Sequence, residues 1–170
     1  MQNNNGQTDT LQTTKVEPHI GIEEHQRAEI VDGLQRFLAN TYTLHLKTLN
    51  YHWHVKGMHF QTLHNFFEEL YTDLNESMDE IAERVLQLGF KAPGNLRAMQ
   101  ELSNIKAGNE HASADQMLSD LLNDYQWMIR SMRQWRAMAD EAGDAATVAM
   151  FDDRLTVFEK QAWMMRAMQS

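Results

Sequence analysis

The chain has 170 residues, a length that suits one domain whose single core needs no disulfide or metal to stabilise it. It contains no cysteine, so disulfides, thiolate metal sites and thiol catalysis are excluded, and any metal must bind nitrogen and oxygen ligands. The formal net charge of −9 disfavours binding to nucleic acid or anionic lipid and favours the accumulation of small cations.

Residues 1–20 are rich in Gln, Asn and Thr and hold few side chains that could join a core. We expect a flexible tail here, followed by one domain over residues 21–170. The start of the chain has neither a basic stretch nor an apolar one, and no apolar run of 18 residues occurs. We therefore expect a cytoplasmic protein without a membrane span.

Two long amphipathic patterns come next, and both predict helices. The first covers residues 23–55, with apolar residues at spacings of three to five, and is interrupted by Gly57. The second covers residues 60–88 and stops at Gly89, which readily adopts the left-handed conformation of a helix end.

A long connection separates these two predicted helices from the rest of the chain. Residues 89–110 contain Pro93, Gly94 and Gly108 around a short helical piece at 95–102. The connection is too long for a tight turn between neighbouring helices, so we predict a crossover that spans the bundle.

Capping residues mark the last two predicted helices. A capping box from Ser113 to Gln116 opens a helix that ends near Gly143, and Asp144 can cap a final helix that ends near Met168. Four long helices with one long crossover between the second and third are typical of ferritin-like bundles. We predict an all-α, ferritin-like four-helix bundle with a short extra helix in that crossover.

The second helix carries the residues best suited to bind a metal. Di-iron proteins of this fold use Glu-x-x-His pairs, and no glutamate here has a histidine three residues later. The helix offers instead two i,i+4 pairs, His64 with Glu68 and Asp79 with Glu83, while His52 stands near the end of the first helix. About 16 Å of straight helix separates Glu68 from Asp79, so one ion cannot bind both pairs. Either each pair forms a weak site, or an antiparallel helix of a second subunit brings the pairs together twice.

Four segments in the first two helices resemble the Dps family of miniferritins, and the resemblance extends over about residues 20–168. They are Tyr51-His-Trp-His-Val-Lys-Gly57, Thr62-Leu-His64, Glu68-Glu-Leu-Tyr71 and Met78-Asp-Glu-Ile-Ala-Glu-Arg84. The resemblance implies a hollow homo-oligomer of twelve subunits with a two-iron ferroxidase site at each dimer interface. The implied catalytic and metal ligands are His52, His64 and Glu68 of one chain with Asp79 and Glu83 of its partner.

The same resemblance implies that the protein oxidises Fe(II), preferably with hydrogen peroxide in a two-electron step. Storage of the Fe(III) mineral inside the shell would then protect the cell against oxidative stress. Imidazole and carboxylate ligands suit Fe(II), Zn and Mn alike, so the choice of iron comes from the resemblance. The family places acidic iron-entry channels near the turn that here holds Asp140, Glu141 and Asp144, although helix capping is the alternative role of Asp144.

Some other residues have simpler interpretations. Asp120 and Asp124 repeat the i,i+4 spacing without an obvious site. Trp53 could intercept radicals beside the implied iron ligand, but we expect this large aromatic residue to pack in the core. His54 lies on a different helix face from His52, and the 12 methionines are expected mainly to fill the core.

The alternative function is a nucleoid protein that protects DNA by binding it, with the iron site secondary. In the best-known pattern of the family a lysine-rich tail binds phosphates, whereas the first twenty residues here offer only Lys15 against Asp9 and Glu17. Without clustered Lys or Arg, little counterion release can drive binding. We expect no appreciable DNA binding at physiological salt.

Overall fold

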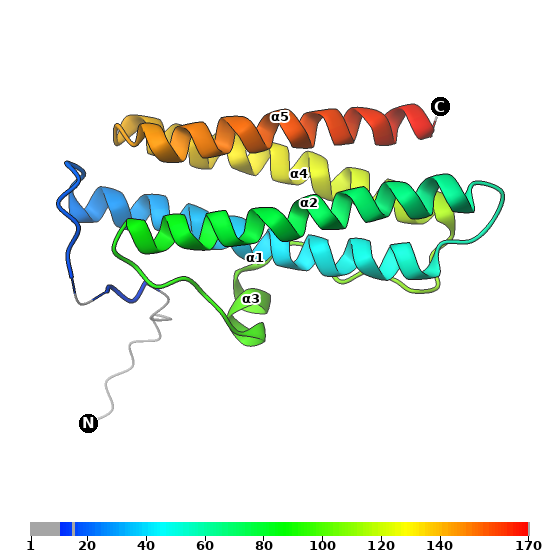
Figure 1. The fold of residues 1–170 in the computed structure, drawn as a ribbon, viewed down its shortest axis with the longest axis horizontal. Helices are drawn as coiled ribbons and strands as arrows, with labels where there is room; N and C mark the ends of the chain where they lie inside the picture. Colours follow the sequence, from blue (N-terminus) through cyan, green and yellow to red (C-terminus); the bar gives the residue numbers. More distant parts are fainter. Residues whose placement is uncertain (1–10, 15, 170) are drawn as a thin grey trace, which may run out of the picture.

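The structure is a computed structural model that describes residues 11–14 and 16–169. Four long helices form a bundle of two antiparallel pairs, and a short helix lies against its side (Figure 1). The helices are α1 (Glu24–His54), α2 (Phe60–Gln87), α3 (Leu96–Leu102), α4 (Ala114–Glu141) and α5 (Ala145–Met168). The predicted ferritin-like bundle with a helix in its crossover is confirmed.

The helix ends follow the local signals in the sequence. Ser113 Oγ accepts a hydrogen bond from the N–H of Gln116, whose side chain accepts one in return, so the predicted capping box at the start of α4 is confirmed. Gly89 and Gly143 have φ values of 89° and 73°, which a residue with a side chain rarely adopts. They end α2 and α4.

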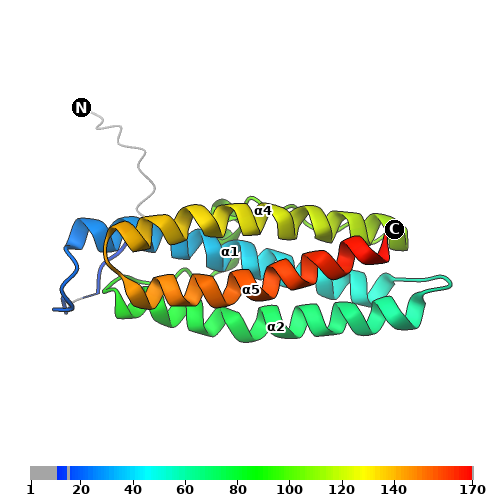
Figure 2. The same ribbon diagram turned by 90° about the horizontal axis from the view of Figure 1, so that it is seen from above.

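The bundle consists of two helix pairs, α1 with α2 and α4 with α5, which lie side by side in both views (Figure 2). The crossover carries α3 along α1 from the end of α2 to the start of α4. Aromatic residues fill the core between the pairs; for example, the rings of Phe37 and Phe151 lie 5.4 Å apart. Among the described residues, no helix combines the length and apolar character that crossing a membrane requires.

Two polar contacts, here called the α1–α4 clamp, join the second half of α1 to α4. Lys47 Nζ lies 2.6 Å from Asp124 Oδ2, and the Tyr51 hydroxyl donates to Asp120 Oδ2 at 2.7 Å. Burial raises the pKa of Asp124 despite the ion pair, and burial together with the bond to Asp120 raises the pKa of Tyr51. The i,i+4 pair on α4 therefore binds side chains of its own chain.

The described part of the predicted tail is attached to the domain. The N–H of Thr14 donates to Gly89 O and the N–H of Lys91 donates to Gln12 O, both at 2.8 Å. The buried Arg27 adds hydrogen bonds to the backbone carbonyl of Pro18, in the same segment, and to that of Ile22, just after it. This part of the predicted tail thus has backbone hydrogen bonds to the turn after α2. The first ten residues lie outside the described chain.

Candidate metal centre

The two predicted histidine ligands face each other between α1 and α2. His52, in the last turns of α1, is only 9% exposed, and His64 lies in the second turn of α2. Their rings stack with centroids 3.7 Å apart. Each Nδ1 also lies at hydrogen-bond distance from the backbone carbonyl of the other residue, at 2.8 Å for His52 and 2.9 Å for His64.

This exchange of hydrogen bonds fixes the tautomer of both imidazoles. A carbonyl oxygen can only accept, so each Nδ1 must carry the proton and donate it. The neutral ring then leaves its lone pair on Nε2, which is the form that binds a metal. Metal-bound histidines are commonly held by such a bond from their other nitrogen. The fold therefore orients both candidate ligands without help from a metal.

Two aromatic residues surround the imidazoles. The Phe60 ring stacks on His64 at 5.0 Å, and the Tyr71 ring contacts His52 edge-on at 5.2 Å. Burial and then the carboxylate of Glu68 raise the pKa of Tyr71. Both aromatic residues were missed in the sequence, although they lie at helical spacings from His64, four residues before it and seven after it.

The carboxylates of the second predicted pair lie apart from the histidines. Asp79 and Glu83 are exposed on α2, and neither makes a hydrogen bond or ion pair within the described residues. In that same part of the chain, no three His, Cys, Asp or Glu side chains come close enough to hold a metal ion. A single chain therefore brings His52 and His64 together and places Glu68 one turn after His64 on α2. Asp79 and Glu83 lie further along the same helix, apart from the histidines.

Asp144 has a structural role within its own chain. It is 3% exposed, and its carboxylate caps α5 by accepting from the N–H of Thr147 at 3.0 Å. Arg84 Nη2 donates to the same carboxylate at 2.6 Å. Burial alone would raise the pKa of Asp144, but the bonds from Arg84 and Thr147 outweigh it and the pKa lies below its usual value. Capping, the alternative interpretation, explains this residue.

The two other residues of the predicted channel, Asp140 and Glu141, are exposed at the end of α4. Asp140 forms an exposed ion pair with Arg136 at 3.3 Å. Both carboxylates remain available at the surface, unlike the buried Asp144.

Trp53 is not in the core of the chain, contrary to expectation, because 62% of its surface is exposed. It follows His52, and consecutive helix residues point about 100° apart. Since His52 faces α2 and Tyr51 faces α4, the next residue is directed outward.

A ferritin-like domain model matches residues 31–170. The DNA protection during starvation protein of Brevibacillus brevis is 40% identical over 134 residues, covering 79% of this chain and 90% of the relative. The chain belongs to the Dps family. A second relative of that name, from Bacillus anthracis, is 34% identical over 139 residues, or 82% of this chain and 95% of its own.

Solved structures of Dps proteins have the same fold. The crystal structure of a Dps protein from Bacillus brevis has a TM-score of 0.85 at 36% identity, covering 88% of this chain and all of the other. That of the Vibrio cholerae O1 Dps protein has a TM-score of 0.87 at 29% identity, covering 91% and 97%. The latter is described as a member of a broad superfamily of ferritin-like diiron-carboxylate proteins. The resemblance to the Dps family is therefore confirmed.

Proposed function

We propose that this Dps protein is an iron-storing and detoxifying miniferritin, a ferroxidase that oxidises Fe(II) at sites shared between two chains. The observation that carries the proposal is the imidazole pair of His52 and His64, whose Nε2 atoms are left free by reciprocal hydrogen bonds. The same helix that holds His64 exposes two carboxylates, Asp79 and Glu83, that have no partner among the residues the structure describes. The description of the Vibrio cholerae relative as a diiron-carboxylate protein supports iron as the substrate.

An antiparallel second copy of α2 would bring the two halves of the site together. His64 and Glu68 of one chain would then meet Asp79 and Glu83 of the other, and the twofold axis would generate two such sites. His64, Glu68, Asp79 and Glu83 all lie on α2, and His52 lies beside it on α1, so a partner that covers this side of the bundle can complete the site without any change in the chain's own fold.

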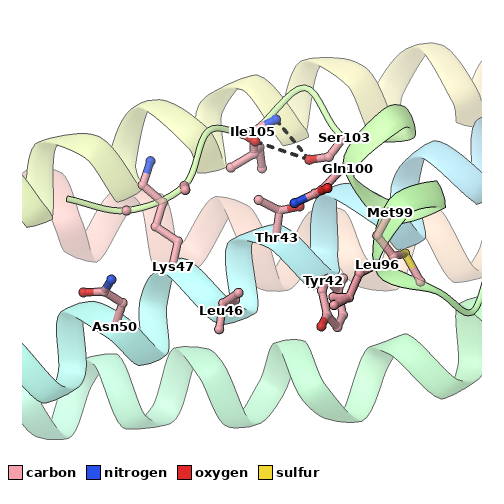
Figure 3. Close-up of a pocket in the computed structure, with 12 residues that line it drawn as sticks. Tyr42, Thr43, Leu46, Lys47, Asn50, Leu96, Met99, Gln100, Ser103 and Ile105 are labelled. Atoms are coloured by element: carbon pink, nitrogen blue, oxygen red, sulfur yellow. Dashed lines mark hydrogen bonds between the residues drawn. The ribbon is translucent and has the colours of Figure 1, made fainter. Parts of the chain in front are cut away.

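The exposed apolar side chains near the histidines support such an interface. Trp53 and Leu46 on α1 are 62% and 51% exposed, and Leu96 of α3 is 64% exposed. Leu46, Leu96 and Met99 line a groove between α1 and α3 (Figure 3). The volume of the groove is about 310 Å³. Large apolar side chains gathered on one face are typical of a surface that is covered in the assembly. We propose a second copy of the chain as its cover, within a twelve-subunit shell in the cytoplasm.

The ligand set suits the oxidation of iron. Neutral imidazoles and carboxylates bind Fe(II), and the three carboxylates of Glu68, Asp79 and Glu83 stabilise the higher charge of Fe(III). Two Fe(II) ions give one electron each to one hydrogen peroxide molecule, which takes up two protons and yields two water molecules. The peroxide bond is thus cleaved by two electrons, and no hydroxyl radical is released. The Fe(III) product would collect as mineral in the shell, with Asp140 and Glu141 as candidate entry residues.

Iron oxidation in matched variants tests the proposal. Fe(II) is added anaerobically to the protein, peroxide follows, and ferric absorbance and elution volume are recorded. We expect fast oxidation with iron retained in a large assembly for the wild type and for Glu80→Ala, which removes a neighbouring exposed carboxylate. Asp79→Ala should be slower by about 100-fold. Unchanged oxidation in Asp79→Ala would show that the site lies elsewhere.

We propose protection through iron chemistry rather than through binding of DNA, which is the alternative suggested by the relatives' names. The formal charge of −9 and the single lysine in the first twenty residues offer little attraction to a duplex. A gel-shift titration that gives micromolar affinity, weakening steeply with salt, would contradict this choice.

A further inference from the structure

Tyr51 and His52 are consecutive residues that bind different neighbours of α1. The Tyr51 side chain is fully buried and its hydroxyl donates to Asp120 of α4 at 2.7 Å. The His52 ring points to α2 and donates to the carbonyl of His64 at 2.8 Å. The end of α1 is therefore held from two sides, by the α1–α4 clamp and by the imidazole pair.

The crossover closes over the clamp and restrains it further. The N–H of Asn109 lies 3.4 Å from the Tyr51 hydroxyl, which thus accepts one hydrogen bond while it donates another. A Cβ atom at Gly108 would lie 3.0 Å from Lys47 Cγ and 3.1 Å from Tyr51 Cε1. The lack of a side chain at residue 108 lets the backbone pack directly on both α1 residues of the clamp.

Such restraint matters because the direction of His52 depends on the rotation of α1 about its own axis. A rotation of about 10° moves an atom about 6 Å from the helix axis by about 1 Å. Metal and catalytic sites need their ligands held to within about 0.5 Å. The imidazole pair restrains His52 at its Nδ1, and the clamp restrains the helix one residue before it.

We propose that Tyr51 is a positioning residue for His52. Its hydrogen bond to Asp120, supported by the neighbouring ion pair of Lys47 with Asp124, sets the rotation of the last turns of α1 so that His52 Nε2 points into the shared metal site. The proposal rests on the proposed function, because it assumes that His52 is a ligand.

The chain offers a matched control for removing this hydroxyl. Tyr125, on α4, is also fully buried, but its hydroxyl makes no hydrogen bond within the described residues. Tyr51→Phe and Tyr125→Phe thus both remove a buried hydroxyl, but only Tyr51→Phe loses a hydrogen bond of the clamp. Asp120→Asn gives a conservative variant, since the amide oxygen can still accept from Tyr51.

Anaerobic titration with Co(II), a coloured probe whose d–d absorption reports ligand geometry, measures the effect without turnover. We expect Tyr51→Phe to weaken Co(II) binding about tenfold, as the loss of outer-shell support typically does, and to shift the d–d spectrum. Tyr125→Phe should bind as the wild type does, and Asp120→Asn should lose less than Tyr51→Phe. Equal binding by Tyr51→Phe and Tyr125→Phe would overturn the proposal.

A double-mutant cycle distinguishes positioning from a general effect on the fold. In a His52→Ala background, Tyr51→Phe should cause no further loss of Co(II) affinity, because the ligand through which it acts is gone. The same loss in both backgrounds would overturn the positioning role while leaving the proposed function intact. Equal Co(II) binding by the wild type and His52→Ala would instead contradict the proposed function itself.

Discussion

The two ends of α2 carry the two halves of the candidate site in different states. At the amino-terminal end, His64 is locked to His52 by stacked rings and two hydrogen bonds. At the carboxyl-terminal end, Asp79 and Glu83 are exposed and form no hydrogen bond or ion pair with any part of the chain that the structure describes. The fold of a single chain orients the histidine half, whereas the carboxylates are positioned only by the helix that carries them.

This difference follows from the chemistry of the side chains. One nitrogen of an imidazole can donate a hydrogen bond to the backbone while the other binds a metal, so the ring can be oriented and still act as a ligand. An exposed carboxylate stays hydrated until a cation binds it, so it has no desolvation cost in the free chain. The histidine half should therefore contribute to stability, and the acidic half should contribute only to function.

The largest expected effect separates these contributions. His52→Ala and Asp79→Ala should each slow iron oxidation by about 100-fold, because each removes a ligand of the proposed shared site. His52→Ala should also lower the free energy of unfolding by about 2 kcal/mol, since it removes a buried, hydrogen-bonded ring. Asp79→Ala should change Tm by less than about 2 °C. Oxidation rates and thermal melts of the two variants measure both effects. Equal losses of stability would contradict the claim that only the histidine half stabilises the fold.

A second prediction concerns the surface that a partner would cover. Leu46→Glu places a charge on an apolar side chain that is 51% exposed beside the α1–α3 groove. Burying an unpaired charge in an interface costs about 3–5 kcal/mol, so we expect the dimer interface to open and oxidation to be lost with it. Elution volume and helical content by circular dichroism check the outcome, with Leu46→Met as the apolar control. A fully assembled, active Leu46→Glu protein would place the interface elsewhere.

A smaller effect is expected at Asp144, whose buried carboxylate forms an ion pair with Arg84. The pKa of this carboxyl is lower in the folded protein than in the unfolded chain, where it is about 3.9. The ion pair therefore stabilises the fold fully above about pH 3.9, and this stabilisation is lost as the pH falls through the folded pKa. Asp144→Asn keeps a capping oxygen but loses the charge, so we expect a loss of about 2 kcal/mol at pH 7.

The difference between the wild type and Asp144→Asn should shrink in thermal melts as the pH falls below the unfolded pKa, about 3.9. Asp153→Asn, which changes an exposed carboxylate on the same helix, serves as the control and should show no such trend. A constant difference at all pH values would mean that the charge of Asp144 is not what stabilises the turn.

Features governed by neighbouring residues could be predicted from the sequence. The helix stops at Gly89 and Gly143 and the capping box at Ser113 act within one turn, and all are present in the structure. The i,i+4 spacing of His64 with Glu68 and of Asp79 with Glu83 likewise identifies two possible pairs of ligands, because the period of a helix is known in advance.

Features that depend on residues far apart in the chain could not be predicted. Arg84 pairs with Asp144, which lies 60 positions later in the chain. Asp144, expected near a channel, therefore forms a buried ion pair. Asp120 and Asp124 have a ligand-like spacing but are occupied by Tyr51 and Lys47 of α1. The rotation of each helix decides such cases, and it also directs Trp53 outward where core packing was expected.

The central claim, that each site is shared between two chains, is tested most directly by complementation. His52→Ala and Asp79→Ala chains carrying different tags are co-expressed, and assemblies that contain both are purified and assayed with Fe(II) and peroxide. At a twofold interface between the two variants, one site carries both substitutions and the other carries neither.

If half of the interfaces are mixed and half of their sites are intact, about a quarter of all sites are active. We predict that mixed assemblies recover about a quarter of the wild-type rate, while each variant alone stays nearly inactive. A mixed assembly that oxidises iron no faster than its parents would contradict a site shared between chains.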